Sequence, residues 1–158
     1  MAFEWLSSIK NIAEIVGSLG DLAKNNRATK DLLIRELKLN LKAFETAQKN
    51  KSINYDKLLL LLKNERIQKA RESRFTFLTL KKGVVENKHI RDDRNKRYVG
   101  KSCEWLFKNI DEKIDDLRNQ KQYHGSLENI DNSVIALQFS NLFYKMKLLA
   151  EFIRPDRF

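Results

Sequence analysis

Residues 131–154 read DNSVIALQFSNLFYKMKLLAEFIR, and this stretch decides the fold class. Apolar side chains recur in it every three or four residues, which is the spacing of one face of an α-helix. The predicted inward positions are Ile135, Phe139, Leu142, Met146, Leu149 and Ile153. Pro155 follows and predicts the end of the helix. An apolar stripe of this length needs other helices to cover it, so the stretch predicts a helical bundle.

Three other stretches show the same helical spacing and are predicted as helices: residues 3–24, 28–48 and 102–119. The stripe of the last one includes Cys103, and the acidic side chains of Asp111, Glu112, Asp115 and Asp116 are expected to face away from it. Asn40 falls on the inner face of residues 28–48. It is either a buried polar group that awaits a partner or an amide bonded to backbone or water.

A fifth helix is predicted to begin at Asn54, which can cap it, with Ile53 and Leu58 forming a hydrophobic staple. Residues 58–62 are five consecutive leucines, which cover every side of a helix. We expect this segment to lie at the centre of the protein, surrounded by other elements.

These helices have short connections, so we predict an all-α antiparallel bundle of four to five helices, formed as a single domain by residues 1–158. Residues 73–101 are the exception, because no helical stripe continues across them. We expect one long irregular basic segment there, pinned to the bundle by the rings of Phe75 and Phe77.

Positive charge is concentrated in the same part of the chain. Residues 63–101 hold 13 basic and 5 acidic side chains, which accounts for most of the net charge of +10. Such a field attracts phosphate groups or an acidic protein surface. Phe75 and Tyr98 lie among the cations, and rings beside guanidinium groups are what single-stranded nucleic acid stacks upon.

We therefore predict a binding or accessory protein, without catalysis, that contacts nucleic acid (RNA or non-specific DNA) or an acidic protein partner. The predicted contact residues are Lys81, Lys82, Lys88, Arg91, Arg94, Lys96, Arg97, Lys101, Phe75 and Tyr98. The alternative for the same residues is a solvated basic face, with the rings serving only to anchor the segment. His89 also lies there, and it touches either phosphate or solvent.

Motifs that carry other chemistry are few. The chain shows no helix-turn-helix template, no glycine-rich phosphate loop, no nucleophile elbow and no histidine pair at metal-ligand spacing, so we expect no cofactor and no metal. The one cysteine, Cys103, excludes an intrachain disulfide and is expected in the core. This cysteine usage fits a reducing, cytosolic setting. We expect a cytoplasmic, prokaryotic protein, and an oligomer is possible.

One motif indicates an enzyme instead. Arg118, Asn119 and, after four more residues, His124 give the pattern Arg-Asn-x4-His. This resembles the Arg-x4–6-His signature of HEPN-type endoribonucleases, which are small helical bundles that usually dimerise and cleave RNA without metal. The resemblance implies that Arg118 holds the scissile phosphate, that Asn119 is the polar residue after it, and that His124 acts as acid or base.

A membrane-associated effector is the third possibility. Phe3 and Trp5 begin an amphipathic helix that could lie on a bilayer. Its polar face is net acidic, with Glu4, Glu14 and Asp21 among its charges, whereas interfacial helices are normally rich in Lys and Arg. We therefore expect residues 3–24 to face the bundle core, and we expect neither a membrane partner nor a membrane-spanning helix.

Overall fold

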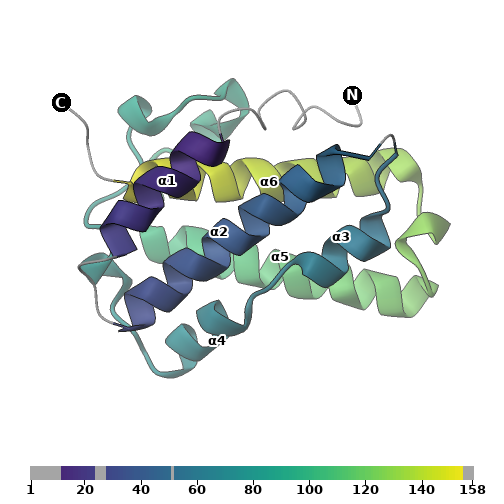
Figure 1. Cartoon of the computed structure of the whole chain (residues 1–158), viewed down its shortest axis with the longest axis horizontal. Coiled ribbons are helices and arrows are strands. Elements are labelled where there is room, and N and C mark those ends of the chain that lie inside the picture. Colours follow the sequence, from purple (N-terminus) through teal and green to yellow (C-terminus); the bar gives the residue numbers. More distant parts are fainter. Residues whose placement is uncertain (1–11, 24–27, 51, 155–158) are drawn as a thin grey trace.

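The computed structural model describes residues 12–23, 28–50 and 52–154. The helices in these ranges are α1 (Ile12–Ala23), α2 (Ala28–Gln48), α3 (Tyr55–Leu61), α4 (Glu65–Glu72), α5 (Cys103–His124) and α6 (Asn132–Ile153). Extended pairing among the described residues is limited to an isolated antiparallel bridge between Val84 and Ser102. The helices pack side by side, as Figure 1 shows, and the all-α prediction is confirmed.

Helix α6 lies at the centre of this arrangement. Every residue from Leu142 to Ala150 is buried, so this part of the helix has no open face. Helices α1, α2 and α5 pack against it, and α5 runs antiparallel to it (Figure 1). A helix with apolar side chains around its whole circumference needs neighbours on every side, and the lysines that this part of α6 also carries are covered with them. The predicted inward residues Ile135, Phe139 and Met146 are fully covered.

The prediction that the five leucines form the centre is wrong. Leu58, Leu59 and Leu62 are buried, but Leu60 is 72% exposed and Leu61 is 46% exposed. Helix α3 is only seven residues long, and its covered side packs against α2, α5 and the turn Leu127–Asn129. These neighbours leave one side of the helix open to solvent, whatever the hydropathy of the residues there.

Buried polar side chains from α2 hold the break between α3 and α4. The amide of Asn40 accepts from the N–H of Lys63 and donates to its carbonyl, both at 2.7 Å. The backbone interpretation of Asn40 is therefore confirmed. Glu36 accepts from the N–H groups of Arg66 (2.8 Å) and Ile67 (3.2 Å), the first turn of α4. Burial raises the pKa of this carboxyl group, and the two N–H groups oppose that shift.

Helix α5 begins where the sequence predicts and continues further than predicted. The Ser102 side chain caps it by accepting from the N–H of Trp105 at 3.1 Å. The helix then runs to His124, beyond the predicted end at Asn119. Gly125 follows with φ of 81°, a left-handed conformation that suits glycine and stops a helix.

The described part of the first helix faces the core. Ile12, Ile15 and Leu19 are buried, and α1 packs against α2 and α6. This agrees with a bundle helix, whereas Phe3 and Trp5 lie outside the described residues. In the parts of the chain that the structure describes, no helix has the length and apolar character needed to cross a membrane.

Neighbouring leucines of α3 allow a sharp test of this packing. Leu59→Ala should lower the free energy of unfolding by about 2–5 kcal/mol, because Leu59 is 3% exposed and its loss leaves a cavity. Leu60→Ala should change it by less than about 0.5 kcal/mol. Urea denaturation followed by circular dichroism measures both, and equal losses would contradict the described position of α3.

Candidate nucleic-acid interface

The segment of residues 73–101 is irregular but closely held. It contains the short 3-10 helices Phe77–Thr79, Asn87–His89 and Asp93–Tyr98. The buried Val85 closes it, because its N–H donates to the Lys101 carbonyl (2.9 Å) and its carbonyl accepts from Gly100 (2.8 Å). The helices Asn87–His89 and Asp93–Tyr98 pack on α6, whereas Phe77–Thr79 packs on α5. Figure 1 shows the course of the chain between α4 and α5. The segment thus forms part of the packed structure.

Aromatic rings anchor both ends of this segment. The Phe75 ring packs edge-on against Phe77 at 5.1 Å, and Phe77 packs against Phe107 of α5 at 5.4 Å. Tyr98 is only 8% exposed and lies 5.7 Å from the ring of Trp105. Phe75 and Tyr98 were predicted as contact residues for nucleic acid, but their placement favours the anchoring alternative.

The side chain of Arg94 also packs against α6. Its guanidinium donates to Ser140 Oγ at 3.0 Å and to Asn141 Oδ1 at 2.5 Å, and it lies 4.4 Å from the Tyr144 ring centre. The neighbouring Asn95 donates to the Tyr144 carbonyl at 3.2 Å. Arg94 therefore fastens the segment to α6 and is a poor candidate for a surface contact.

Asp92 and His89 of the segment also contact side chains of α6. The Asp92 carboxylate lies 3.2 Å from Nζ of Lys147, which is 4% exposed. His89 is buried, its Nδ1 accepts from the Glu86 N–H, and its ring packs 4.9 Å from Phe152. The expectation that His89 touches phosphate or solvent is therefore wrong, because the imidazole belongs to the core packing.

Five of the predicted contact cations remain exposed: Lys82, Lys88, Arg91, Lys96 and Arg97. Three of these five have a carboxylate nearby. Glu86 lies 3.5 Å from Lys88, Asp93 lies 3.2 Å from Lys96, and Glu151 lies 4.0 Å from Arg91. Lys81 and Lys101 are half-buried. Lys81 lies 5.5 Å from the Phe152 ring centre.

The structure brings three cations together around an aromatic pair. We call Arg97, Tyr98, Lys101, Trp105 and Lys145 the Tyr98 cluster. Arg97 and Lys145 lie 4.9 and 5.6 Å from the Tyr98 ring centre, and Lys101 lies 4.8 Å from that of Trp105. Among the described residues, none of the three cations has a carboxylate within ion-pair distance. Cation–ring contacts reduce the cost of such a grouping but add no negative charge.

Lys145 is the most constrained of these cations. It projects from the buried helix α6 and is only 9% exposed. Burial, together with the charges of Arg97 and Lys113, lowers its pKa from the ordinary 10.5 to about 8. Near neutral pH it is a desolvated positive charge with like charges around it, which is an environment that favours an anion.

Sequence reasoning missed Lys145 and Trp105, although a signal for the first was present. Lys145 and Lys147 interrupt the apolar run of the last helix, and a charge on a helix that is buried all round needs an explanation. Lys147 has its explanation in Asp92. Nothing in the sequence shows that the basic segment folds back to place Arg97 beside Lys145, with Lys101 over the adjacent Trp105 ring.

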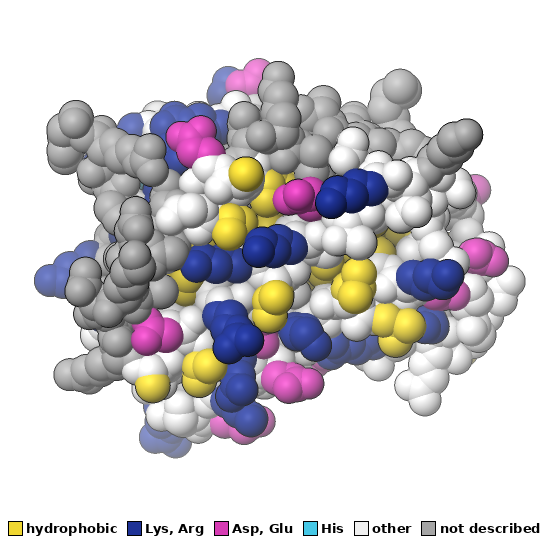
Figure 2. All heavy atoms as spheres, viewed as in Figure 1, with side chains coloured by type: hydrophobic (Ala, Val, Ile, Leu, Met, Phe, Trp, Pro, Cys, Tyr) yellow, Lys and Arg dark blue, Asp and Glu magenta, His cyan; other side chains and the backbone are white. Residues whose placement is uncertain are grey.

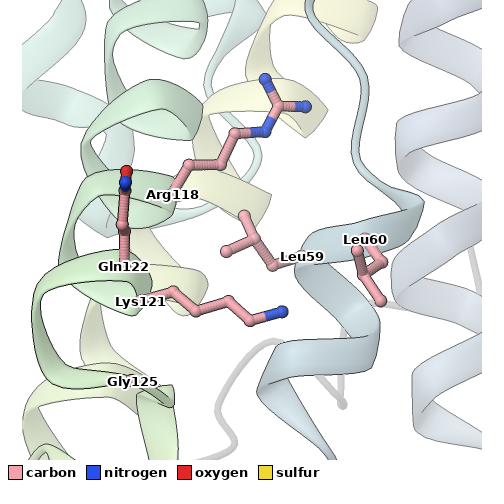
Figure 3. Close-up of a pocket in the computed structure, with 6 residues that line it drawn as sticks. All are labelled: Leu59, Leu60, Arg118, Lys121, Gln122 and Gly125. Carbon is pink, nitrogen blue, oxygen red and sulfur yellow. The ribbon is translucent and has the colours of Figure 1, made fainter.

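Arg118 and His124 do not converge within the chain. They are six positions apart on one helix, which places them about 120° apart around its axis and about 9 Å apart along it. The Arg118 guanidinium donates to Asn64 Oδ1 at 2.6 Å and to the Leu62 carbonyl at 3.1 Å, so it bridges α5 to the connection after α3. Figure 3 shows the side chain reaching toward that connection. Asn119 and His124 are exposed.

The polar network that holds Arg118 includes Asp111, which was expected to face away from the core and is 4% exposed. Asn64 donates to the Asp111 carboxylate at 2.9 Å and to that of Asp115 at 2.8 Å, and Arg71 pairs with Asp111 at 2.5 Å. These carboxylates bind the α3–α4 region to α5. Within the described ranges, no group of three or more His, Cys, Asp or Glu side chains could hold a metal ion.

Comparison with protein-family models, with curated proteins and with solved structures found no match for the chain. The likeness to HEPN-type endoribonucleases therefore rests on the residues from Arg118 to His124.

The roles of Arg118 and His124 in stability can be separated. Arg118→Ala should lower the free energy of unfolding by about 1–3 kcal/mol, because it leaves Asn64 Oδ1 and the Leu62 carbonyl without this donor. His124→Ala should change stability by less than about 0.5 kcal/mol. Urea titration tests both, and an unchanged Arg118→Ala variant would contradict the bridging role.

Lys145 should make stability depend on pH. The pKa of Lys145 is about 8 in the folded protein, against the ordinary value of 10.5 that we take for the unfolded chain. Between about pH 8 and pH 10.5 the unfolded chain therefore binds more protons than the folded protein does. Stability from this group therefore rises with pH across that window. Lys145→Met should raise the melting temperature at pH 7, and its advantage should shrink toward pH 10. The control Lys82→Met, at an exposed site, should show no such trend, and parallel curves for wild type and Lys145→Met would refute the shift.

Proposed function

We propose that this protein is a nucleic-acid-binding module that contacts the phosphate backbone through the Tyr98 cluster and the exposed cations beside it. The observation that carries the proposal is the grouping of Arg97, Lys101 and Lys145 without a carboxylate partner among the described residues. A phosphate group placed among them would supply the missing negative charge. The cytoplasm, where nucleic acid and a reduced Cys103 are both expected, is the proposed compartment.

Two further observations support this proposal. The first is the charge distribution, since residues 63–101 carry 13 basic against 5 acidic side chains. The second is the packing of residues 81–101 on α6, which holds Arg97 and Lys101 in place before any ligand arrives. A preorganised cluster loses less conformational entropy on binding than flexible lysines do.

The proposed contact is independent of base sequence. Tyr98 is buried and Phe75 packs against Phe77, so neither ring is presented for base stacking. Phosphate contacts position a nucleic acid but do not read its sequence. We therefore propose binding of single-stranded RNA or of DNA without sequence preference, and we treat an acidic protein as the competing ligand.

Charge reversal in the cluster tests the proposal. The probe is a fluorescein-labelled oligouridine, with binding followed by fluorescence anisotropy over a series of salt concentrations. The double variant Arg97→Glu, Lys101→Glu should bind at least about tenfold more weakly. It should also flatten the log–log salt slope by about 1.4, since each lost phosphate contact accounts for about 0.7. Arg94 is left unchanged because it holds the segment to α6.

The matched control is Arg35→Glu, Lys42→Glu, which makes the same change in net charge at exposed positions of α2. It should retain most of the affinity of the parent protein. Equal weakening in the two double variants would mean that only net charge attracts the RNA. A parent protein that binds neither oligouridine nor a DNA duplex at low salt would refute the proposal and favour an acidic protein partner.

A further inference from the structure

An apolar ridge stands on the open side of α3. Leu60 is 72% exposed, and the adjacent Leu61 is 46% exposed. Single exposed leucines are ordinary on protein surfaces, but these two are contiguous and border hollows on both sides. Leu60 lines both hollows, so it forms the ridge that divides them.

The two hollows are large enough to receive side chains. The first, of about 400 Å³, lies between α3 and the end of α5 and is lined by Leu59, Leu60, Arg118, Lys121, Gln122 and Gly125. Figure 3 shows Lys121 extending from α5 across this hollow toward α3. The second, of about 690 Å³, lies between α3 and the end of α2, with Ala47, Lys57 and Leu61 in its lining.

Among the described residues, the charged side chains that line these hollows are all basic: Lys57, Arg118 and Lys121. Arg118 lies 3.4 Å from the Asp115 carboxylate, so Lys57 and Lys121 are the rim cations on which the argument depends. Asp56, the acidic neighbour on α3, is turned to the short 3-10 helix η5 (Leu127–Asn129), where it accepts from Ser126 Oγ and from the Leu127 N–H. In Figure 2, hydrophobic side chains alternate with Lys and Arg over α2, α3 and α4, and acidic side chains are fewer.

We infer that this ridge is a docking surface for an acidic amphipathic helix of a partner protein. Apolar side chains of that helix would enter the hollows on either side of Leu60, and its carboxylates would pair with Lys57 and Lys121 at the rim. An acidic amphipathic helix has an apolar stripe bordered by carboxylates, which complements the apolar ridge and the lysines at its rim. The described residues offer no strand edge for an extended peptide to join, so recognition falls to side chains.

The surface is distinct from the Tyr98 cluster in the residues it uses, so the two proposals can fail separately. The probe is a labelled peptide of about 18 residues with leucines at i, i+3, i+4 and i+7 and glutamates elsewhere. Fluorescence anisotropy should show binding to the full-length protein. Leu60→Asp should weaken it at least about tenfold, because the ridge is lost and a like charge is introduced. Lys121→Glu should weaken it about threefold or more.

The control Leu137→Asp, at a 54% exposed leucine of α6, should bind the peptide as the parent does. The Arg97→Glu, Lys101→Glu variant should also bind it unchanged, and oligouridine should not displace it. The inference would be overturned if the parent protein did not bind the peptide. It would also be overturned if the parent bound equally well a peptide in which lysines replace the glutamates. A dimer in light scattering that Leu60→Asp dissociates would overturn it too, because the occupant would then be a second copy.

Discussion

Burial of α6 on every side is the constraint on which the rest of this structure depends. From Leu142 to Ala150 the helix has no face open to water, so three helices and several turns must surround it. A polar group carried inward on such a helix is costly unless it finds a partner. Lys147 finds one in Asp92, and the Tyr144 carbonyl receives a donor from Asn95. The irregular segment supplies both partners, so it covers α6 in addition to carrying many of the basic side chains of the protein.

That double role accounts for the division among the basic residues of the segment. Arg94 is used to fasten the cover, and its removal would expose the α6 side chains that it binds. Lys88 and Lys96 are exposed and paired locally with acidic neighbours. Arg97 shares the Tyr98 ring with Lys145, whose pKa is lowered by the burial that α6 requires, and Lys101 lies over the neighbouring Trp105 ring. The proposed ligand site thus arises because the irregular segment covers Lys145, and no carboxylate of the described residues lies within ion-pair distance of that lysine.

A second arrangement of buried polar groups holds the connection between α3 and α4. Asn40 and Glu36 satisfy the backbone where α3 ends and α4 begins, and Asn64 joins this turn to α5 through Arg118 and Asp111. The chain can leave the helical conformation here because these side chains bond the backbone N–H and C=O groups that have no partner within a helix. The break keeps α3 short and peripheral, and for that reason part of its leucine run faces solvent.

The sequence by itself determined where α1, α2, α3, α5 and α6 lie, because apolar periodicity and caps such as Asn54 and Ser102 are local properties of the chain. It did not predict α4, which is short and lies in the strongly basic stretch after residue 62. It also placed the excess charge in residues 63–101 and the thiol of Cys103 in the core. Only the tertiary structure decided which helix is central, because a leucine run and the apolar α6 look equally able to be buried until their neighbours are known. The same holds for the Tyr98 cluster: Lys145 lies more than forty residues after Arg97 and Lys101 in the chain, and only the fold of the segment over α6 brings their like charges together.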